Sequence, residues 1–143
     1  MSVTRLLRIA SIVSVLFAIG HLAGAPDHWS PMGDNPVLKA MTAEHFDILG
    51  SQRSYLDIFM DFGWTVGAAM LLQGVLLWLL APLAKADPRP VRPMILAFVL
   101  ANLANTVFAW CFMFIIPQVF STALVVILAA ACFVSFRAKS VTA

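Results

Sequence analysis

The chain has 143 residues, of which 62% are hydrophobic and only 11% are charged. Soluble domains carry about 25% charged residues, so this composition indicates an integral membrane protein. A net charge of +2, with no basic cluster interleaved with aromatic residues, argues against a nucleic acid as partner. Cys111 and Cys132 lie in apolar runs without a C-x-x-C pair, so we expect buried packing thiols.

The first apolar run extends over residues 4–25 and has Arg5 and Arg8 at its start. One interpretation is a secretory signal, with the Ala-Gly-Ala of residues 23–25 as a small-residue cleavage site. The other is a first transmembrane helix with His21 near its far end. We favour the helix, because the chain has several apolar runs near the length of a membrane span.

The connection over residues 26–53 is predicted to face outward. Its first part, Pro26 to Met41, contains three prolines with Gly and Asn turn signals, which favour a loop. From Val37 to Leu49 the apolar residues fall near one side of a helix. This pattern predicts one short amphipathic helix that lies at the membrane surface as a partial lid.

The second long helix is predicted over residues 54–83. Arg53, Asp57, Asp61 and Trp64 would share one face, because residues at i, i+4, i+8 and i+11 nearly superpose around a helix axis. A span needs about 20 residues, and counting back from the far end reaches only to Trp64. We therefore expect Asp61 at the membrane interface and Asp57 about one turn outside it.

Three prolines stop this helix in a short charged turn, residues 85–93. The third span is predicted over residues 94–116, with Asn102 and Asn105 on one face near its middle. Pro117 and Gln118 form the tightest connection, and the fourth span follows over residues 119–136.

The whole chain, residues 1–143, is thus predicted to be one all-α domain. Lipid offers no hydrogen bonds to a backbone, so four spans joined by short connections must form a helical bundle. Glycine and alanine at several positions of the second and third spans would allow their backbones to approach closely.

Basic residues gather on one side of this four-span arrangement. Seven of the nine Lys and Arg residues lie near the termini or in the turn 85–93, and only Lys39 and Arg53 lie on the other side. The positive-inside rule then predicts a multi-pass protein of the bacterial inner membrane with both termini in the cytoplasm.

Polar side chains concentrate in the outer halves of the predicted helices, whereas the cytoplasmic halves are almost purely apolar. Polar groups this near hydrocarbon are expected to face the bundle interior. The asymmetry predicts a cleft that opens outward. Its candidate catalytic residues are Asp61, Asp57 and His21, and its candidate ligand-binding residues are Arg53, Trp64, Asn102, Asn105 and Trp110.

Each candidate also has a purely structural interpretation. Arg53 and Asp57 could form an interfacial ion pair worth about 0.3–0.5 kcal/mol. His21 could only bond a neighbouring helix, and asparagines in spans more often join helices than bind ligands. The functional interpretation depends on repulsion between Asp57 and Asp61, which would favour uptake of a proton by one carboxylate and suit acid/base chemistry or a cation site.

Histidines 21, 28 and 45, with the two aspartates, are ligand types that suit zinc or iron. No pair of histidines has helical ligand spacing, so we expect neither a metal nor another cofactor. Ser54 has no evident base, and no G-x-S-x-G occurs, which argues against nucleophilic catalysis.

Four short segments carry a resemblance to a family. Gly20-His21, Glu44-His45-Phe46-Asp47, Arg53-Ser54-Tyr55-x-Asp57 and Phe62-Gly63 resemble those of small bacterial four-helix membrane proteins that have no assigned function. The resemblance covers nearly the whole chain and implies a fold but no activity. In architecture the chain is also similar to the sterol-isomerase and sigma-2 receptor group, and in hydropathy to the DoxX-like proteins.

Three functions remain open from the sequence. The first is binding of a small amphiphilic, lipid-like ligand in the outward cleft, with acid/base chemistry as an extension. The second is a proton- or ion-coupled transporter subunit that uses Asp61 and His21 in a homo-oligomer. The third is a non-catalytic interaction protein whose polar strip docks a loop of a partner.

Overall fold

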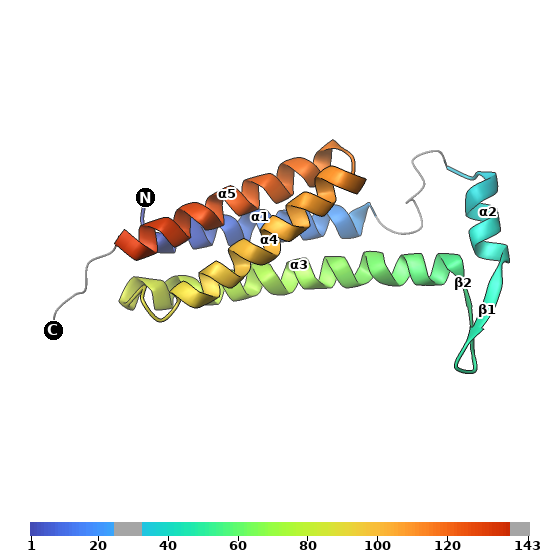
Figure 1. The fold of residues 1–143 in the computed structure, drawn as a ribbon, viewed down its shortest axis with the longest axis horizontal. Coiled ribbons are helices and arrows are strands. Elements are labelled where there is room, and N and C mark those ends of the chain that lie inside the picture. Colours follow the sequence, from blue (N-terminus) through green and yellow to red (C-terminus); the bar gives the residue numbers. More distant parts are fainter. Residues whose placement is uncertain (25–32, 138–143) are drawn as a thin grey trace. The chain divides into compact units, whose positions relative to one another are not determined.

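The computed structural model describes residues 1–24 and 33–137. Within these ranges the chain forms five helices and one two-stranded antiparallel hairpin (Figure 1). The elements are α1 (Val3–Ala23), α2 (Pro36–Ala43), β1 (His45–Ile48), β2 (Ser51–Ser54), α3 (Tyr55–Ala86), α4 (Arg92–Phe112) and α5 (Ile115–Arg137).

Helices α1, α3, α4 and α5 are each long and apolar enough to cross a membrane. This is the helix content of a multi-pass membrane protein, as the composition predicted. Pro117 does not form the last connection. It lies in the first turn of α5, where its missing N–H has no intrahelical partner to lose, and the chain turns at Met113 and Phe114 instead.

The fold is helical as predicted except between α2 and α3, where two strands replace the second half of the predicted loop helix. A helix was predicted from Val37 to Leu49, but α2 ends at Ala43 and the hairpin follows. Asn35 caps α2, since its side-chain oxygen accepts the N–H groups of Val37 and Leu38 at 3.0 and 3.1 Å. Whether α2 lies at the membrane surface stays a prediction.

The hairpin pairs His45 with Ser54 and Ile48 with Ser51. Its turn residues, Leu49 and Gly50, have φ of 53° and 83°. Positive φ at both positions is what a two-residue type I′ turn requires. The Asp47 carboxylate accepts the Gly50 N–H at 2.9 Å, which holds the turn closed.

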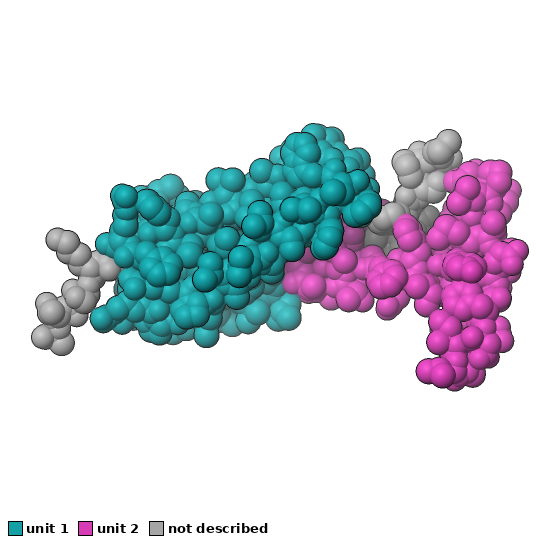
Figure 2. All heavy atoms as spheres, in the orientation of Figure 1, with its two compact units in different colours: residues 1–17, 71–143 teal, residues 18–70 magenta. Residues whose placement is uncertain are grey.

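The chain divides into two compact units (Figure 2). Unit 1 comprises residues 1–17 and 71–143 and is a four-helix bundle, built from the first part of α1, the second part of α3, and α4 and α5. Its fully buried side chains include Leu7, Leu77, Ile95, Leu124 and Leu128.

Small residues allow the backbones of α1 and α3 to approach within unit 1. The Ser11 hydroxyl donates to the Gly74 carbonyl at 2.6 Å, and a Cβ at Gly74 would lie 2.6 Å from Val15. This is the close packing that small residues permit between membrane helices.

Unit 2 comprises residues 18–70 and holds the end of α1, α2, the hairpin and the first part of α3. The Phe46 ring packs on Tyr55 with ring centroids 4.8 Å apart, which joins the hairpin to the start of α3. A Cβ at Gly67 would lie 2.3 Å from Leu22, so α1 and α3 also meet closely here.

Candidate functional site

Arg53 does not belong to the helix face on which it was predicted. It lies on β2, because α3 begins only at Tyr55. Its guanidinium donates to the Gln52 carbonyl at 2.8 Å. Among the described residues it makes no ion pair with Asp57.

Asp57 is part of the cap of α3. Its carboxylate accepts the Ser54 N–H at 2.8 Å, and the Ser54 hydroxyl accepts the Asp57 N–H at 3.1 Å. This reciprocal pair is a capping box, with Ser54 at the N-cap and Asp57 three residues on. The carboxylate that was a candidate catalytic group therefore has a structural function that accounts for its position.

Asp61 and Trp64 lie further along α3 and are both exposed, Trp64 by 49%. Asp61 forms no ion pair with any described residue. Of the predicted strip, these two residues and Asp57 do lie on one helix, with Asp61 one turn from each.

His21 faces a different side of α3. Its Nε2–H donates to the Gly63 carbonyl at 2.8 Å. Gly63 is two residues after Asp61, so the two positions are about 200° apart around the helix axis. Within unit 2, the histidine is thus bonded to the backbone and is not turned toward either aspartate.

Asn102 lies at the centre of a buried polar cluster in unit 1. Its amide nitrogen donates to Gln73 Oε1 and to the Phe98 carbonyl, both at 2.8 Å, and it is only 4% exposed. Gln73 in turn donates to Ser14 Oγ at 3.1 Å. The amides tie α1, α3 and α4 together.

The sequence reasoning missed Gln73 and Ser14 as partners of Asn102. A glutamine in the middle of an apolar span was a usable signal, because such an amide needs a partner. No buried side-chain nitrogen or oxygen in the described part of the chain lacks a hydrogen-bond partner.

Asn105 and Trp110 do not join this cluster. Both are exposed on α4, and the Trp110 indole N–H donates to Thr122 Oγ1 at 3.1 Å across to α5. Cys111 is also exposed and Cys132 is only partly buried, so the prediction of two buried thiols is wrong. The buried face of α4 is formed by Ile95, Asn102 and Ala109.

No group of three metal-ligating side chains occurs in residues 1–24 and 33–137. His28, one of the three histidines considered as ligands, lies outside the described residues. His45 is on β1, and its Nδ1–H donates to the Ala43 carbonyl at 2.8 Å.

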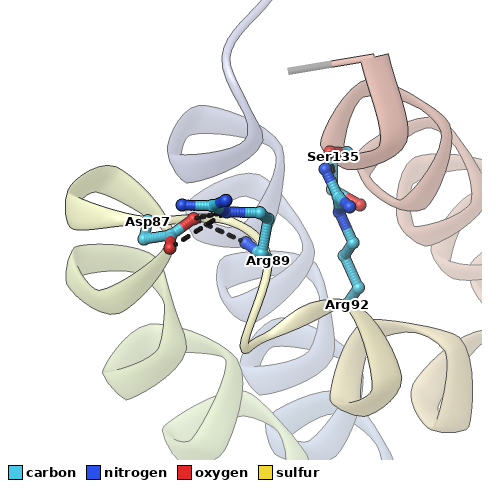
Figure 3. Close-up of polar contacts among 4 residues, drawn as sticks. All are labelled: Asp87, Arg89, Arg92 and Ser135. Atoms are coloured by element: carbon cyan, nitrogen blue, oxygen red, sulfur yellow. Dashed lines mark hydrogen bonds and ion pairs between the residues drawn. The ribbon is translucent and has the colours of Figure 1, made fainter. Parts of the chain in front are cut away.

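The connection between α3 and α4, which carries Arg89, meets the last turn of α5 at one end of unit 1. This end, called here the basic end, carries a second set of polar contacts (Figure 3). Arg89 donates to the Asp87 carboxylate from Nε, at 3.1 and 3.2 Å, and from its backbone N–H, at 3.0 Å. These bonds and the charge of Arg89 hold the pKa of Asp87 below its usual range. Arg92 donates to the Ser135 carbonyl at 2.6 and 3.0 Å, which satisfies a carbonyl in the last turn of α5.

Comparison of the chain with protein-family models, with characterised proteins and with solved structures gave no match.

Proposed function

We propose that this protein is a non-catalytic membrane interaction protein that assembles with a second copy of itself through α4. The observation that carries the proposal is Asn105. It is the fourteenth residue of the 21-residue helix α4, about 10 Å from its last residue, and its side chain is exposed.

An exposed amide at this depth would face hydrocarbon, where it has no water to bond. Among the described residues the Asn105 side chain has no hydrogen-bond partner. Asparagine side chains in membrane helices gain about 0.6–2 kcal/mol by bonding across a helix interface. A second helix against this face would supply that partner.

The neighbouring face of α4 suits close helix packing. Ala97, Ala101, Ala104, Phe108 and Cys111, called here the α4 stripe, are all exposed and follow one another at intervals of four and three residues. This spacing keeps them on one side of the helix, with Asn105 one turn from Ala101. Three alanines allow a second backbone to approach.

A second copy of the chain is the simplest partner for the α4 stripe. An amide carries both a donor and an acceptor, so two Asn105 side chains related by a two-fold axis satisfy each other. A catalytic function would use Asp57 and His21 as acid/base groups. Both already have structural hydrogen bonds, because Asp57 caps α3 and His21 binds the Gly63 carbonyl, and this argues against the catalytic alternative.

Native Cys111 tests this assembly. In membranes from cells expressing Cys132→Ser, mild oxidation is expected to link Cys111 of two copies into a disulfide dimer on a denaturing gel. Asn105→Leu in the same background is expected to lower the association constant by about threefold to thirtyfold, the equivalent of the lost hydrogen bond, and the linked fraction should fall with it.

The matched control moves the thiol to another exposed side of α4, with Cys111→Ser, Cys132→Ser and Leu103→Cys. Leu103 is 49% exposed but lies off the stripe. Equal linking through residue 103, or linking through Cys111 that Asn105→Leu leaves unchanged, would contradict the proposal.

A second candidate function, binding of an amphiphile, is favoured by Asp61 and Trp64. They lie one turn apart on α3 and are both exposed, and apolar residues follow them within unit 2 from Val66 to Met70. A ligand with a cationic head and an apolar tail matches that order of groups. Native mass spectrometry of the purified protein should then detect a retained ligand that Asp61→Asn loses. Identical spectra for both proteins would remove this candidate.

The transporter alternative has no observation of its own in its favour. For location, the proposal keeps the bacterial inner membrane with both termini in the cytoplasm, because the basic residues of unit 1 lie near the start of α1, near the end of α5 and around the α3–α4 connection, which Figure 1 shows at one end of the bundle.

A further inference from the structure

Arg8 and Trp78 form a stacked pair near the basic end of unit 1. The guanidinium carbon of Arg8 lies 3.7 Å from the centroid of the Trp78 ring. Arg8 is the sixth residue of α1, and Trp78 lies eight residues before the end of α3. The pair is therefore about 8–12 Å inside the ends of the two helices, within the spans but close to one interface.

No acidic side chain accompanies this charge. The described part of unit 1 has six basic side chains and one carboxylate, Asp87, which is bonded to Arg89. Arg8 makes no ion pair with any described residue. A positive charge at this depth is costly unless an anion or a dipole compensates it.

The stacked geometry leaves Arg8 able to bind an anion. A guanidinium presents its flat face to an aromatic ring and its five N–H donors at its edge. Trp78 occupies the face, so the edge remains for oxygens. By contrast, Arg89 is bonded to Asp87 and Arg92 to the Ser135 carbonyl (Figure 3).

We infer that Arg8 and Trp78 bind the phosphate group of an anionic phospholipid. Arginine binds phosphate through two parallel N–H···O bonds, and lipid phosphates are the anions nearest to this depth. The surplus of basic side chains at this end favours a headgroup with a net negative charge over a zwitterionic one. The indole supplies the amphipathic contact typical of a membrane interface.

The test titrates the delipidated full-length protein in detergent with phosphatidylglycerol and follows bound lipid by native mass spectrometry. Arg8→Gln is expected to weaken binding about fivefold or more, the contribution of one basic residue at a charged membrane surface. Trp78→Leu changes no charge and should also weaken binding, because it removes the ring that orients the guanidinium. Arg8→Lys should restore only part of the loss.

Arg5→Gln is the matched control. It removes the same charge one turn away, from an exposed arginine that stacks on no ring among the described residues. A smaller loss than that of Arg8→Gln supports the site. Equal losses of lipid binding from both arginine substitutions, with no effect of Trp78→Leu, would mean that the basic residues attract anionic lipid without a specific site, and would overturn the inference.

Two further ligands test whether the site prefers an anionic lipid over a zwitterionic lipid and over free phosphate. Phosphatidylcholine should bind more weakly than phosphatidylglycerol and show a smaller effect of Arg8→Gln. Inorganic phosphate at the same concentration should not displace the lipid. Equal binding of both lipids, or displacement by inorganic phosphate, would contradict an anionic-lipid site. If Arg8→Gln does not fold, Trp78→Leu and Arg8→Lys still decide the outcome.

Discussion

Single residues in this protein are most informative where a polar group meets its partner. Asn102, Gln73 and Ser14 satisfy one another inside unit 1, so the amides stabilise the bundle without exposing a polar group to lipid. Asn105, three residues on, has no such partner among the described residues. The contrast between two asparagines on one helix distinguishes the structural role of Asn102 from the interface role proposed for Asn105.

Asp87 gives a prediction about pH. Its folded pKa is lowered by the Arg89 side chain and backbone, so the folded state binds this proton less tightly than the unfolded state, whose pKa is near 3.8. The stabilisation is present above pH 3.8 and is lost as the pH falls below it through the folded pKa.

Arg89→Gln should raise the pKa of Asp87 toward 3.8, but only in part, because the backbone N–H of residue 89 still donates. Carbon NMR of the Asp87 carboxyl during an acid titration in micelles measures this. Arg5→Gln changes the net charge equally and should leave the titration unchanged. A pKa that does not move in Arg89→Gln would contradict the assigned cause.

At the scale of elements, the start of α3 shows how a pattern of charges can be misread. The spacing of Arg53, Asp57 and Asp61 suggested one charged helix face, but Ser54 caps the helix and leaves Arg53 on a strand. The motif Ser-x-x-Asp before an apolar run is itself a capping signal. The sequence contained the correct local interpretation alongside the functional one.

Ser54→Ala is expected to weaken the first turn of α3 by about 1 kcal/mol, the usual effect of removing an N-cap hydroxyl. The backbone N–H of Asp57 should then exchange with solvent about fivefold faster in hydrogen-exchange NMR, since it loses its acceptor. Ser54→Asn, which keeps an acceptor, should preserve the slow rate. Ser51→Ala in the same hairpin serves as a control, and an equal effect there would rule out the cap as the cause.

For the whole molecule, periodicity and length predicted the four membrane helices, because lipid leaves a spanning chain few choices. The ends of these helices differ from the predicted ends by a few residues. At the start of α5 the difference arises because Pro117 can lie in the first turn of a helix as well as interrupt one. The hairpin was missed because its turn is Leu49-Gly50, which lacks the Asn-Gly or Asp-Gly signal of type I′ turns.

The candidate site was predictable only in part. The sequence gives the position of each polar residue along a span, but it does not give the rotation of that residue around the helix axis. That rotation decides that Asn102 is buried and Asn105 exposed, and that His21 and Asp61 meet different sides of α3. Partners such as Gln73 and Ser14 come from other helices, so only the packed bundle identifies them.

The hairpin tip has a practical consequence. Leu49 is fully exposed, so its side chain packs against none of the described residues. Its backbone is left-handed, a conformation that costs a leucine about 1–2 kcal/mol. Surface turns of this kind tolerate added sequence. An epitope or a fluorophore-labelling tag inserted between Leu49 and Gly50 would therefore offer a handle for imaging and purification that leaves both chain ends untouched.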